Sequence, residues 1–521
     1  MGLLKQAALV LAAGLALAGC THTIAPAPQI TAEFAKAEAL ADAGCYSCLQ
    51  EALPIYQRFA GLASPPPGAA ERLFNTAVLI AVREKELGIP ADASVARARQ
   101  LVVPSRQAVL DAAMLVIGDT SGLDPEQRAQ LTGRVRPSLE PDNPVRRALD
   151  AYSPSDVTAT YVGLTIDCEQ PRLLDSVDMV RLKAAYADSP LLQFRLATCA
   201  RPSAPSVSDI RAADPRWTDT LYWEGRRELV ASMGRAIDFG KALGFFAQGR
   251  EAFPASLMLS MAWANTNLAG EEFEGALSGF NDVLARYPTH RDALSGRMQA
   301  LSYLMRHDEA IATATTILDL GTWNISDANY WRAWNRYQIK QFDAAWVDVE
   351  NATKGLSNAR VYMLAGLIAY ARKDLPVAVD RFDRAFQVDS SACDAVWMSG
   401  LVSIDENALA IAAPKFTRGM TCFISAASAL RAELARYEDT VAKRGTPPTS
   451  RDERQMQRLK HDADTAEEKS AQSAFNGAQC YARTGNKAVA LNHVDAAIAH
   501  PSMREKALAL KAAIEKLPNR D

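Results

Sequence analysis

The eight cysteines are the first residues of this sequence whose type and spacing could do chemistry. Cys45 and Cys48 form a Cys-x-x-Cys pair, a spacing used in redox motifs and in covalent haem attachment. Haem attachment needs a histidine at the next position, where this chain has Leu49. Thioredoxin-like chemistry needs a strand–turn–helix setting, and no strand pattern flanks the pair. We therefore interpret these cysteines as a local disulfide or as two packing thiols.

The later cysteines suit structural disulfides. Cys393 should open the first helix of a helical hairpin, and Cys422 should lie near the end of the second. These two ends of an antiparallel hairpin meet at one pole, so we predict a disulfide between them. Cys168 and Cys199 have a similar separation, and we predict the same for them. We expect Cys480 to be a buried single thiol.

The six histidines form no recognisable catalytic or metal-binding motif. None belongs to a His-Glu-x-x-His sequence, and the chain has no Gly-x-Ser-x-Gly and no phosphate-cradling loop. His493 and His500 are too far apart on a helix to share a metal at adjacent turns. We expect no enzyme, no cofactor and no metal site.

The N-terminus reads MGLLKQAALVLAAGLALAGC, one lysine followed by a short apolar run. The run is too short for a transmembrane helix and is typical of a signal peptide. Its ending, Leu17-Ala18-Gly19-Cys20, resembles the bacterial lipoprotein cleavage box. This resemblance implies that Cys20 becomes the lipid-carrying first residue. Thr21 replaces the aspartate associated with inner-membrane retention, which favours the outer membrane, facing the periplasm. The alternative is an ordinary secretory signal beside a chance cysteine.

A repeat organises the middle of the chain. Six alanines mark it at successive spacings of 34, 34, 35, 33 and 34 residues. If each is position 20 of a unit, position 24 is apolar and one helical turn further along the same face. Such a period predicts stacked helical hairpins, because each unit buries its apolar face against its neighbours. The alanines are Ala242, Ala276, Ala310, Ala345, Ala378 and Ala412, and the position-24 residues are Phe246, Phe280, Ala314, Val349, Phe382 and Phe416.

Other positions of the unit also hold recurring residue types. Position 8 is small in most units (Ala264, Ala333, Gly366, Gly400), whereas Met298 departs from this rule. The units Leu257–His290, Ala359–Ala392 and Ala471–Arg504 resemble the tetratricopeptide repeat (TPR), over roughly half the chain. The resemblance implies an all-α, TPR-type helical-hairpin solenoid, an α-α superhelix. The alternative is a non-repetitive helical bundle with chance alanines.

The chain divides by composition into six expected segments. The linker RPSAPSVS at 201–208 is the clearest boundary. The stretch 443–470 carries thirteen charged residues of both signs, typical of a solvated helix or mobile loop, with a docking arm as the functional alternative. The segments are a signal peptide (1–19), a lipid-anchored tether (20–30), a helical N-terminal region with degenerate repeats (31–205), the core array (206–426), a charged helical insert (427–470), and a C-terminal repeat with a closing helix (471–521).

The family resemblance assigns positions 2, 5, 9 and 12 of each first helix to the concave face, and their spacing makes them one helical stripe. In three neighbouring units this stripe is rich in aromatic side chains, which dominate binding hot spots and also stack on sugar rings. Alternatively, the stripe packs against a terminal helix, or our register is off by one. The predicted groove residues are Tyr330, Trp334, Tyr337, Met363, Tyr370 and Trp397.

The functional expectation follows from these features together. A net charge of −3 and no basic stripe argue against nucleic acid. By its resemblance to TPR lipoproteins, we expect a non-catalytic scaffold of the bacterial cell envelope. It would bind an extended or helical segment of envelope proteins involved in assembly, secretion, pilus formation or export. The alternative is a lipoprotein that binds glycan or peptidoglycan through an aromatic groove.

Overall fold

The computed structural model describes residues 27–118, 147–149, 151–152, 155–169, 176–199, 206–231, 239–321, 324–445 and 447–518. Within these ranges the chain consists of helices and connecting turns, without a strand, so the predicted all-α class is confirmed. No helix in the same ranges is long and apolar enough to cross a bilayer. The expected signal peptide, Cys20 and most of the tether lie outside the described residues.

The N-terminal helices share one apolar core. Its largest fully buried side chains include Tyr56, Phe74, Tyr161 and Phe194. Consecutive helices pack against each other from α1 to α4, while α8 packs on α3, α5 and α10. The elements are α1 (Ala27–Ala43), α2 (Tyr46–Ala60), α3 (Ala69–Leu87), α4 (Asp92–Leu101), the 3-10 turn η1 (Pro104–Arg106), α5 (Gln107–Ile117), α8 (Val157–Glu169), α9 (Ser176–Ala185) and α10 (Pro190–Thr198).

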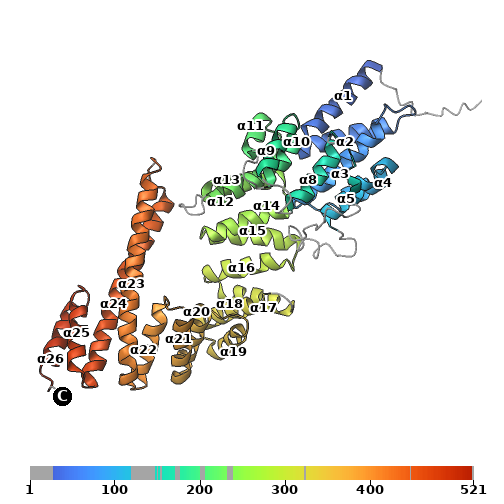
Figure 1. Cartoon of the computed structure of the whole chain (residues 1–521). Helices are drawn as coiled ribbons and strands as arrows, with labels where there is room; N and C mark the ends of the chain where they lie inside the picture. Colours follow the sequence, from blue (N-terminus) through green and yellow to red (C-terminus); the bar gives the residue numbers. More distant parts are fainter. Residues whose placement is uncertain are drawn as a thin grey trace, which may run out of the picture.

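This core continues across the linker at 201–208 into the start of the array. The Phe194 ring lies 5.0 Å from the Trp217 ring, and Trp217 is fully buried. The backbone N–H of Leu257 donates to the carbonyl oxygen of Gly88 over 2.9 Å. The N-terminal helices therefore form a packed end of the array (Figure 1). The connecting elements are α11 (Val207–Ala213), η2 (Thr218–Thr220), α12 (Leu221–Ala231) and α13 (Phe239–Ala252).

The array itself is a series of helical hairpins in which each helix packs on the next (Figure 1). Its first helices begin at residues 257, 291, 325, 359 and 393, a constant step of 34 residues. The predicted hairpin solenoid and its period are therefore confirmed. The hairpins are α14 (Leu257–Ala269) with α15 (Phe273–Arg286), α16 (Arg291–Tyr303) with α17 (His307–Asp319), α18 (Ile325–Gln338) with α19 (Phe342–Thr353), α20 (Ala359–Ala371) with α21 (Leu375–Val388), and α22 (Cys393–Asp405) with the first part of α23 (Leu409–Ala442).

Complementary side-chain volumes close each hairpin. A Cβ built on Gly366 would lie 2.6 Å from ring carbons of Phe382, and one on Gly400 would lie 3.0 Å from the Phe416 ring. Glycine at position 8 thus makes room for phenylalanine at position 24. The departure at Met298 has the same cause, since its unit has the small Ala314 at position 24, and both side chains are fully buried in one cluster. In this unit the large side chain is on the first helix and the small one is on the second.

The turn inside each hairpin uses a left-handed residue at position 15. Its φ angle is +62° at Glu271 and +57° at Met305, and similar values recur in the next three units. The residue after it donates its backbone N–H to a carbonyl oxygen near the end of the first helix, as Glu272 does to Asn267. This bond gives a partner to a carbonyl that the helix itself leaves unpaired. The last repeat has Gly485 at this position, the residue that adopts this conformation without strain. In those three units the residue at position 15 is Lys340, Lys373 or Asn407.

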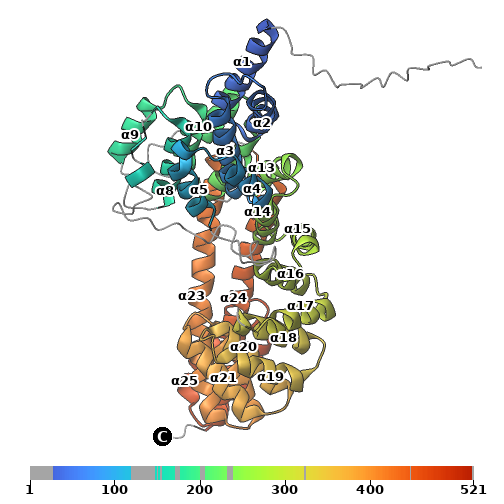
Figure 2. The same cartoon turned by 90° about the vertical axis from the view of Figure 1, so that its right-hand side faces the viewer.

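Two helices of 34 residues each, α23 and α24 (Ser450–Arg483), extend well beyond the array. Their outer part, residues 427–470, forms a two-helix projection that we call the arm. Leu459 and Ala463 of α24 are buried in it, as is Val441 of α23. Figures 1 and 2 show the arm running back along the array toward α13 and α14. The chain closes with α25 (Lys487–Ile498) and α26 (Arg504–Glu515).

Candidate partner-binding site

The concave face of the first two repeats contains a hollow of about 530 Å³. The first helices α14 and α16 present positions 2, 5 and 9 to it, which is the stripe expected from the repeat. Sequence reasoning applied this stripe only to later units, so it missed these residues, although the same rule would have found them. The lining includes Met258, Met261, Asn265 and Leu268 of α14, Asp292, Ser295 and Gln299 of α16, and Tyr222 of α12.

The chemistry of this hollow suits a polypeptide. Asn265 is exposed and Gln299 is half-buried, and both occupy position 9 of neighbouring units. A carboxamide offers both a donor and an acceptor, which match the N–H and C=O groups of a peptide backbone. Met258 and Met261 are flexible apolar side chains that adapt to varied surfaces. The hollow therefore combines backbone recognition with an adaptable apolar wall.

The predicted aromatic residues occupy several different environments. Tyr330 is only 5% exposed, and the Arg360 guanidinium lies 4.4 Å from its ring centroid. Burial raises the pKa of the Tyr330 hydroxyl. Trp334 and Tyr337 are half-buried and pack together at a centroid distance of 6.5 Å. Three of the six groove candidates thus contribute to packing within the array.

The other three candidates lie further along the array. Tyr370 is 39% exposed, and its hydroxyl donates to Asp405 over 2.9 Å, which raises the pKa of that hydroxyl. Met363 lines a second hollow, of about 500 Å³, between α20, α22 and the arm. Trp397 lies under the arm, with the Lys469 amine 5.7 Å from its ring. The set therefore does not form one open aromatic row.

Met363 and Trp397 lie near the base of the arm, beside a disulfide. The structure pairs Cys393 with Cys422, which ties α23 to the start of α22. It also pairs Cys168 with Cys199 and Cys45 with Cys48. Cys480 is a buried free thiol. Burial raises its pKa to about 11.

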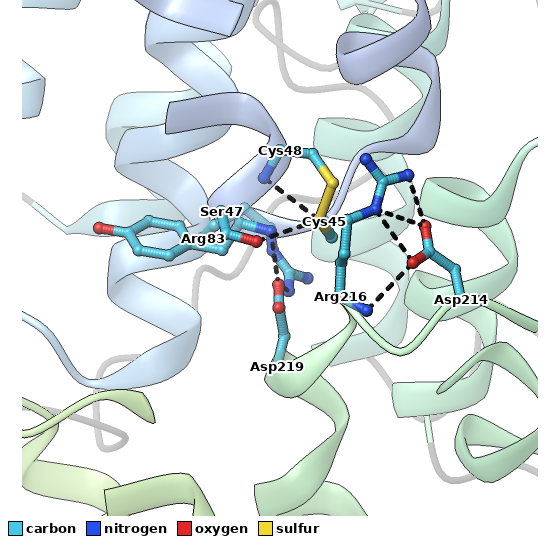
Figure 3. Close-up of a disulfide and its surroundings, with 8 residues drawn as sticks. Cys45, Ser47, Cys48, Arg83, Asp214, Arg216 and Asp219 are labelled. Atoms are coloured by element: carbon cyan, nitrogen blue, oxygen red, sulfur yellow. Dashed lines mark hydrogen bonds and ion pairs between the residues drawn. A yellow bond between two sulfur atoms is a disulfide. The ribbon is translucent and has the colours of Figure 1, made fainter. Parts of the chain in front are cut away.

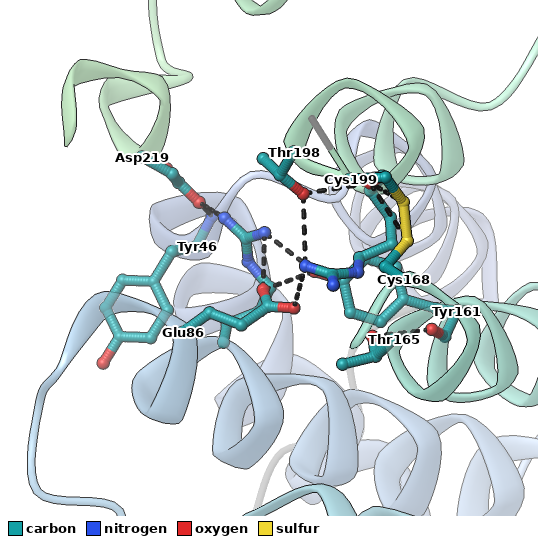
Figure 4. A network of polar contacts seen from close by, with 10 residues as sticks. Tyr46, Glu86, Tyr161, Thr165, Cys168, Thr198, Cys199 and Asp219 are labelled. Atoms are coloured by element: carbon teal, nitrogen blue, oxygen red, sulfur yellow. Dashed lines mark hydrogen bonds and ion pairs between the residues drawn. A yellow bond between two sulfur atoms is a disulfide. The ribbon is translucent and has the colours of Figure 1, made fainter. Parts of the chain in front are cut away.

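A buried polar network holds the N-terminal helices to the array (Figures 3 and 4). Arg83 of α3 is fully buried and is paired with Asp219 of η2 and with Glu86, at 3.0 Å from the latter. Asp219 also accepts from the N–H of Tyr46 over 2.9 Å, beside the Cys45–Cys48 disulfide. These charges pair with one another across several helices, so we assign them a structural role.

The described histidines also make structural contacts. Nδ1 of His290 accepts from the N–H of Ala293 and caps α16. His307 and Asn335 form a hydrogen bond of 2.9 Å between helices, and His493 lies 2.9 Å from the Thr417 hydroxyl. Within the described ranges, no three side chains of histidine, cysteine, aspartate or glutamate are grouped to hold a metal ion.

Comparison with known proteins gives structural likeness only. No family model matches the chain, and no curated protein matches it. Among solved structures it is similar to YrrB, described as a TPR protein with an unusual peptide-binding site, at 16% identity and a TM-score of 0.32 over 45% of this chain and 97% of that one. It is also similar to a tetratricopeptide repeat protein from Parabacteroides merdae (12%, TM-score 0.32, 57% and 100% covered).

A third similar structure is the Cut9–Hcn1 hetero-tetramer of the APC/C, at 13% identity and a TM-score of 0.29, with 94% of this chain and 90% of that one covered. At such TM-scores the fold of this chain rests on its own helix boundaries and packing. They make it an all-α array of helical hairpins with the TPR period.

Proposed function

We propose that this chain is a non-catalytic scaffold whose concave face binds an extended or helical segment of another protein. The observation that carries the proposal is the hollow over α14 and α16, where position 9 of two successive units supplies a carboxamide. A rigid array presents these groups at a fixed spacing. A bound segment can therefore pair with both while the array loses little conformational entropy.

Binding is favoured over catalysis by the groups that line the hollow. They include amides, methionines, a serine and Tyr222, together with Asp292 and the helix-capping His290. His290 Nδ1 already accepts the N–H of Ala293, so this atom is not available as a general base. The geometry thus supports recognition. A protein segment is also favoured over a glycan, because the aromatic candidates do not present a continuous row of open rings.

We further propose that the scaffold works in the bacterial envelope, held at the outer membrane by a lipid on Cys20 and facing the periplasm. The cleavage-box resemblance supports this, and three cysteine pairs suit an oxidising compartment. A lipid anchor would concentrate the groove near membrane-embedded partners. If the Cys20→Ala variant still fractionates with membranes after salt washing, this part of the proposal is wrong.

The groove is tested by co-purification from crosslinked envelopes. Replacing both Asn265 and Gln299 with alanine removes two amide groups, each contributing about 1 kcal/mol, so affinity should fall about tenfold or more. Asn281→Ala is the matched control, an exposed asparagine on the second helix of the same repeat, outside the hollow. The proposal expects one envelope protein to be lost with the double variant and kept with the control. Equal recovery would contradict it, and retention on purified peptidoglycan would favour the glycan alternative.

A further inference from the structure

The arm returns to the array at a point far from its own base. Near its tip, Arg458 of α24 pairs with Glu271, and Arg454 lies 3.7 Å from Glu272. These two glutamates form the turn between α14 and α15. Glu271 lies three residues beyond Leu268, which lines the hollow of the candidate site. The tip of the arm thus contacts the rim of that hollow.

At its base the same face of α24 meets the concave side of α20 and α22. Lys469 pairs with Asp394 over 2.6 Å, and its amine lies over the Trp397 ring. Asp462 and Thr465 border the second hollow opposite Arg360 and Met363. The residues at 454, 458, 462, 465 and 469 are spaced by three or four, so they form one stripe of the helix. This stripe therefore reaches from α22 at one end to the α14–α15 turn at the other.

The two ends of this contact differ in strength. At the base, the Cys393–Cys422 disulfide ties α23 to α22, and Phe423, Ala427 and Ala466 are buried together. At the tip, the two pairs are between side chains 49–67% exposed to solvent. Exposed pairs of this kind are weak and are screened by salt. Between Ala466 and Arg454 lie about 18 Å of helix, so a small bend at the base parts the tip from the array.

We propose that the arm is a strap over the concave groove, latched at its tip by Arg454 and Arg458 on Glu271 and Glu272, and that it swings out to admit a partner. This inference rests on the proposed function, which assigns partner binding to the groove. The strap occupies part of the face on which a helical segment would lie, so it competes with that segment.

The arm can move as a unit because it is built as one. Arg431 of α23 pairs with Asp464 and Glu467 of α24. Thr449 caps the start of α24 in a capping box with Asp452, and the Asp452 carboxylate also accepts from the Tyr437 hydroxyl of α23. These contacts stay inside the arm. Opening therefore breaks the tip contact and leaves the two-helix core of the arm intact.

The test measures the arm of the full-length chain without any partner, so its outcome is independent of the proposed function. Spin labels on Gln457→Cys of α24 and Glu274→Cys of α15 report the tip-to-array distance by pulsed electron resonance. At low salt we expect a short, narrow distribution. Arg454→Glu with Arg458→Glu should remove more than half of the short-distance population. Adding Glu271→Arg and Glu272→Arg should restore it, because the charges are exchanged.

Two controls complete the experiment. Labels on Glu433→Cys and Lys460→Cys, one on each helix of the arm, should keep their distance in every variant, which shows that the arm remains folded. Raising ionic strength from about 0.01 M to about 1 M shortens the Debye length from about 30 Å to about 3 Å and should open the unmodified latch. If the tip distance stays short after charge reversal and at high salt, the arm is a fixed part of the array and the proposal is wrong. A broad distribution at low salt in the unmodified chain would also overturn it.

Discussion

The fit between glycine and phenylalanine predicts the effect of a single methyl group at Gly366. Gly366→Ala places a Cβ 2.6 Å from ring carbons of Phe382, and both residues are buried. Overpacking of this kind costs about 1–3 kcal/mol. Replacing glycine inside a helix by alanine gains about 1 kcal/mol in propensity. The net expected change is a loss of up to about 2 kcal/mol in the stability of the α20–α21 hairpin.

Gly244→Ala is the matched control for this prediction. Gly244 lies inside α13, and a Cβ there has no atom within 4 Å, so only the propensity gain remains. The difference between the two variants isolates the overpacking term of about 1–3 kcal/mol. Hydrogen exchange of the α20–α21 and α12–α13 amides measures each hairpin separately, which suits an array whose units are stabilised locally. If Gly366→Ala stabilises its hairpin as Gly244→Ala does, the volume argument is refuted.

Three further predictions concern other parts of the chain. Met298→Ala should destabilise α16–α17 by about 2–5 kcal/mol in urea unfolding, because Ala314 cannot fill the cavity; little change would show that the site collapses. Burial raises the pKa of Glu84 above its ordinary 4.5, so this group stabilises the fold below pH 4.5 and loses that contribution as pH rises through the folded value. Glu84→Gln should therefore gain stability over the unmodified chain as pH increases toward neutrality, and a pH-independent difference would contradict this. Cys480, with its raised pKa, should resist alkylation at about pH 8 until α24 unfolds, and rapid labelling of the folded chain would contradict its burial.

The repeat was predictable because its signal is local and recurs in phase. Ala276 and Phe280 lie one turn apart on the same helix, so their common face can be recognised from the sequence alone. The exchange of sizes between Met298 and Ala314 was not recognised, since it depends on which side chains meet across two helices. The same limit hid the contact between Gly296 and Phe280, which joins neighbouring units.

The candidate site was harder to predict than the fold. A stripe of positions 2, 5, 9 and 12 marks the concave side of each first helix, but it does not say which positions are covered. Tyr330 is covered by Arg360 of the next unit and Trp397 by Lys469 of the arm, 72 residues further along the chain. The open hollow instead lies over Asn265 and Gln299, which occupy position 9 of their units but are not aromatic.

The arm illustrates a second limit. Its mixed charges favoured a solvated helix or a mobile loop, with docking as the alternative. Val441 of α23 and Leu459 and Ala463 of α24 are buried in the arm, so its apolar residues are few and are spread over two helices. The ion pair of Arg458 with Glu271 links residues 187 positions apart. Contacts at that separation follow from the curvature of the whole array.

The most direct test of the central claim places a photo-crosslinking amino acid at position 265 of the full-length chain in intact cells. The same substitution at position 281, outside the hollow on the second helix of that repeat, is the control. If the concave face holds a protein segment, position 265 yields a discrete adduct with an envelope protein, and position 281 does not. No adduct at 265, or the same adducts at both positions, would contradict the account.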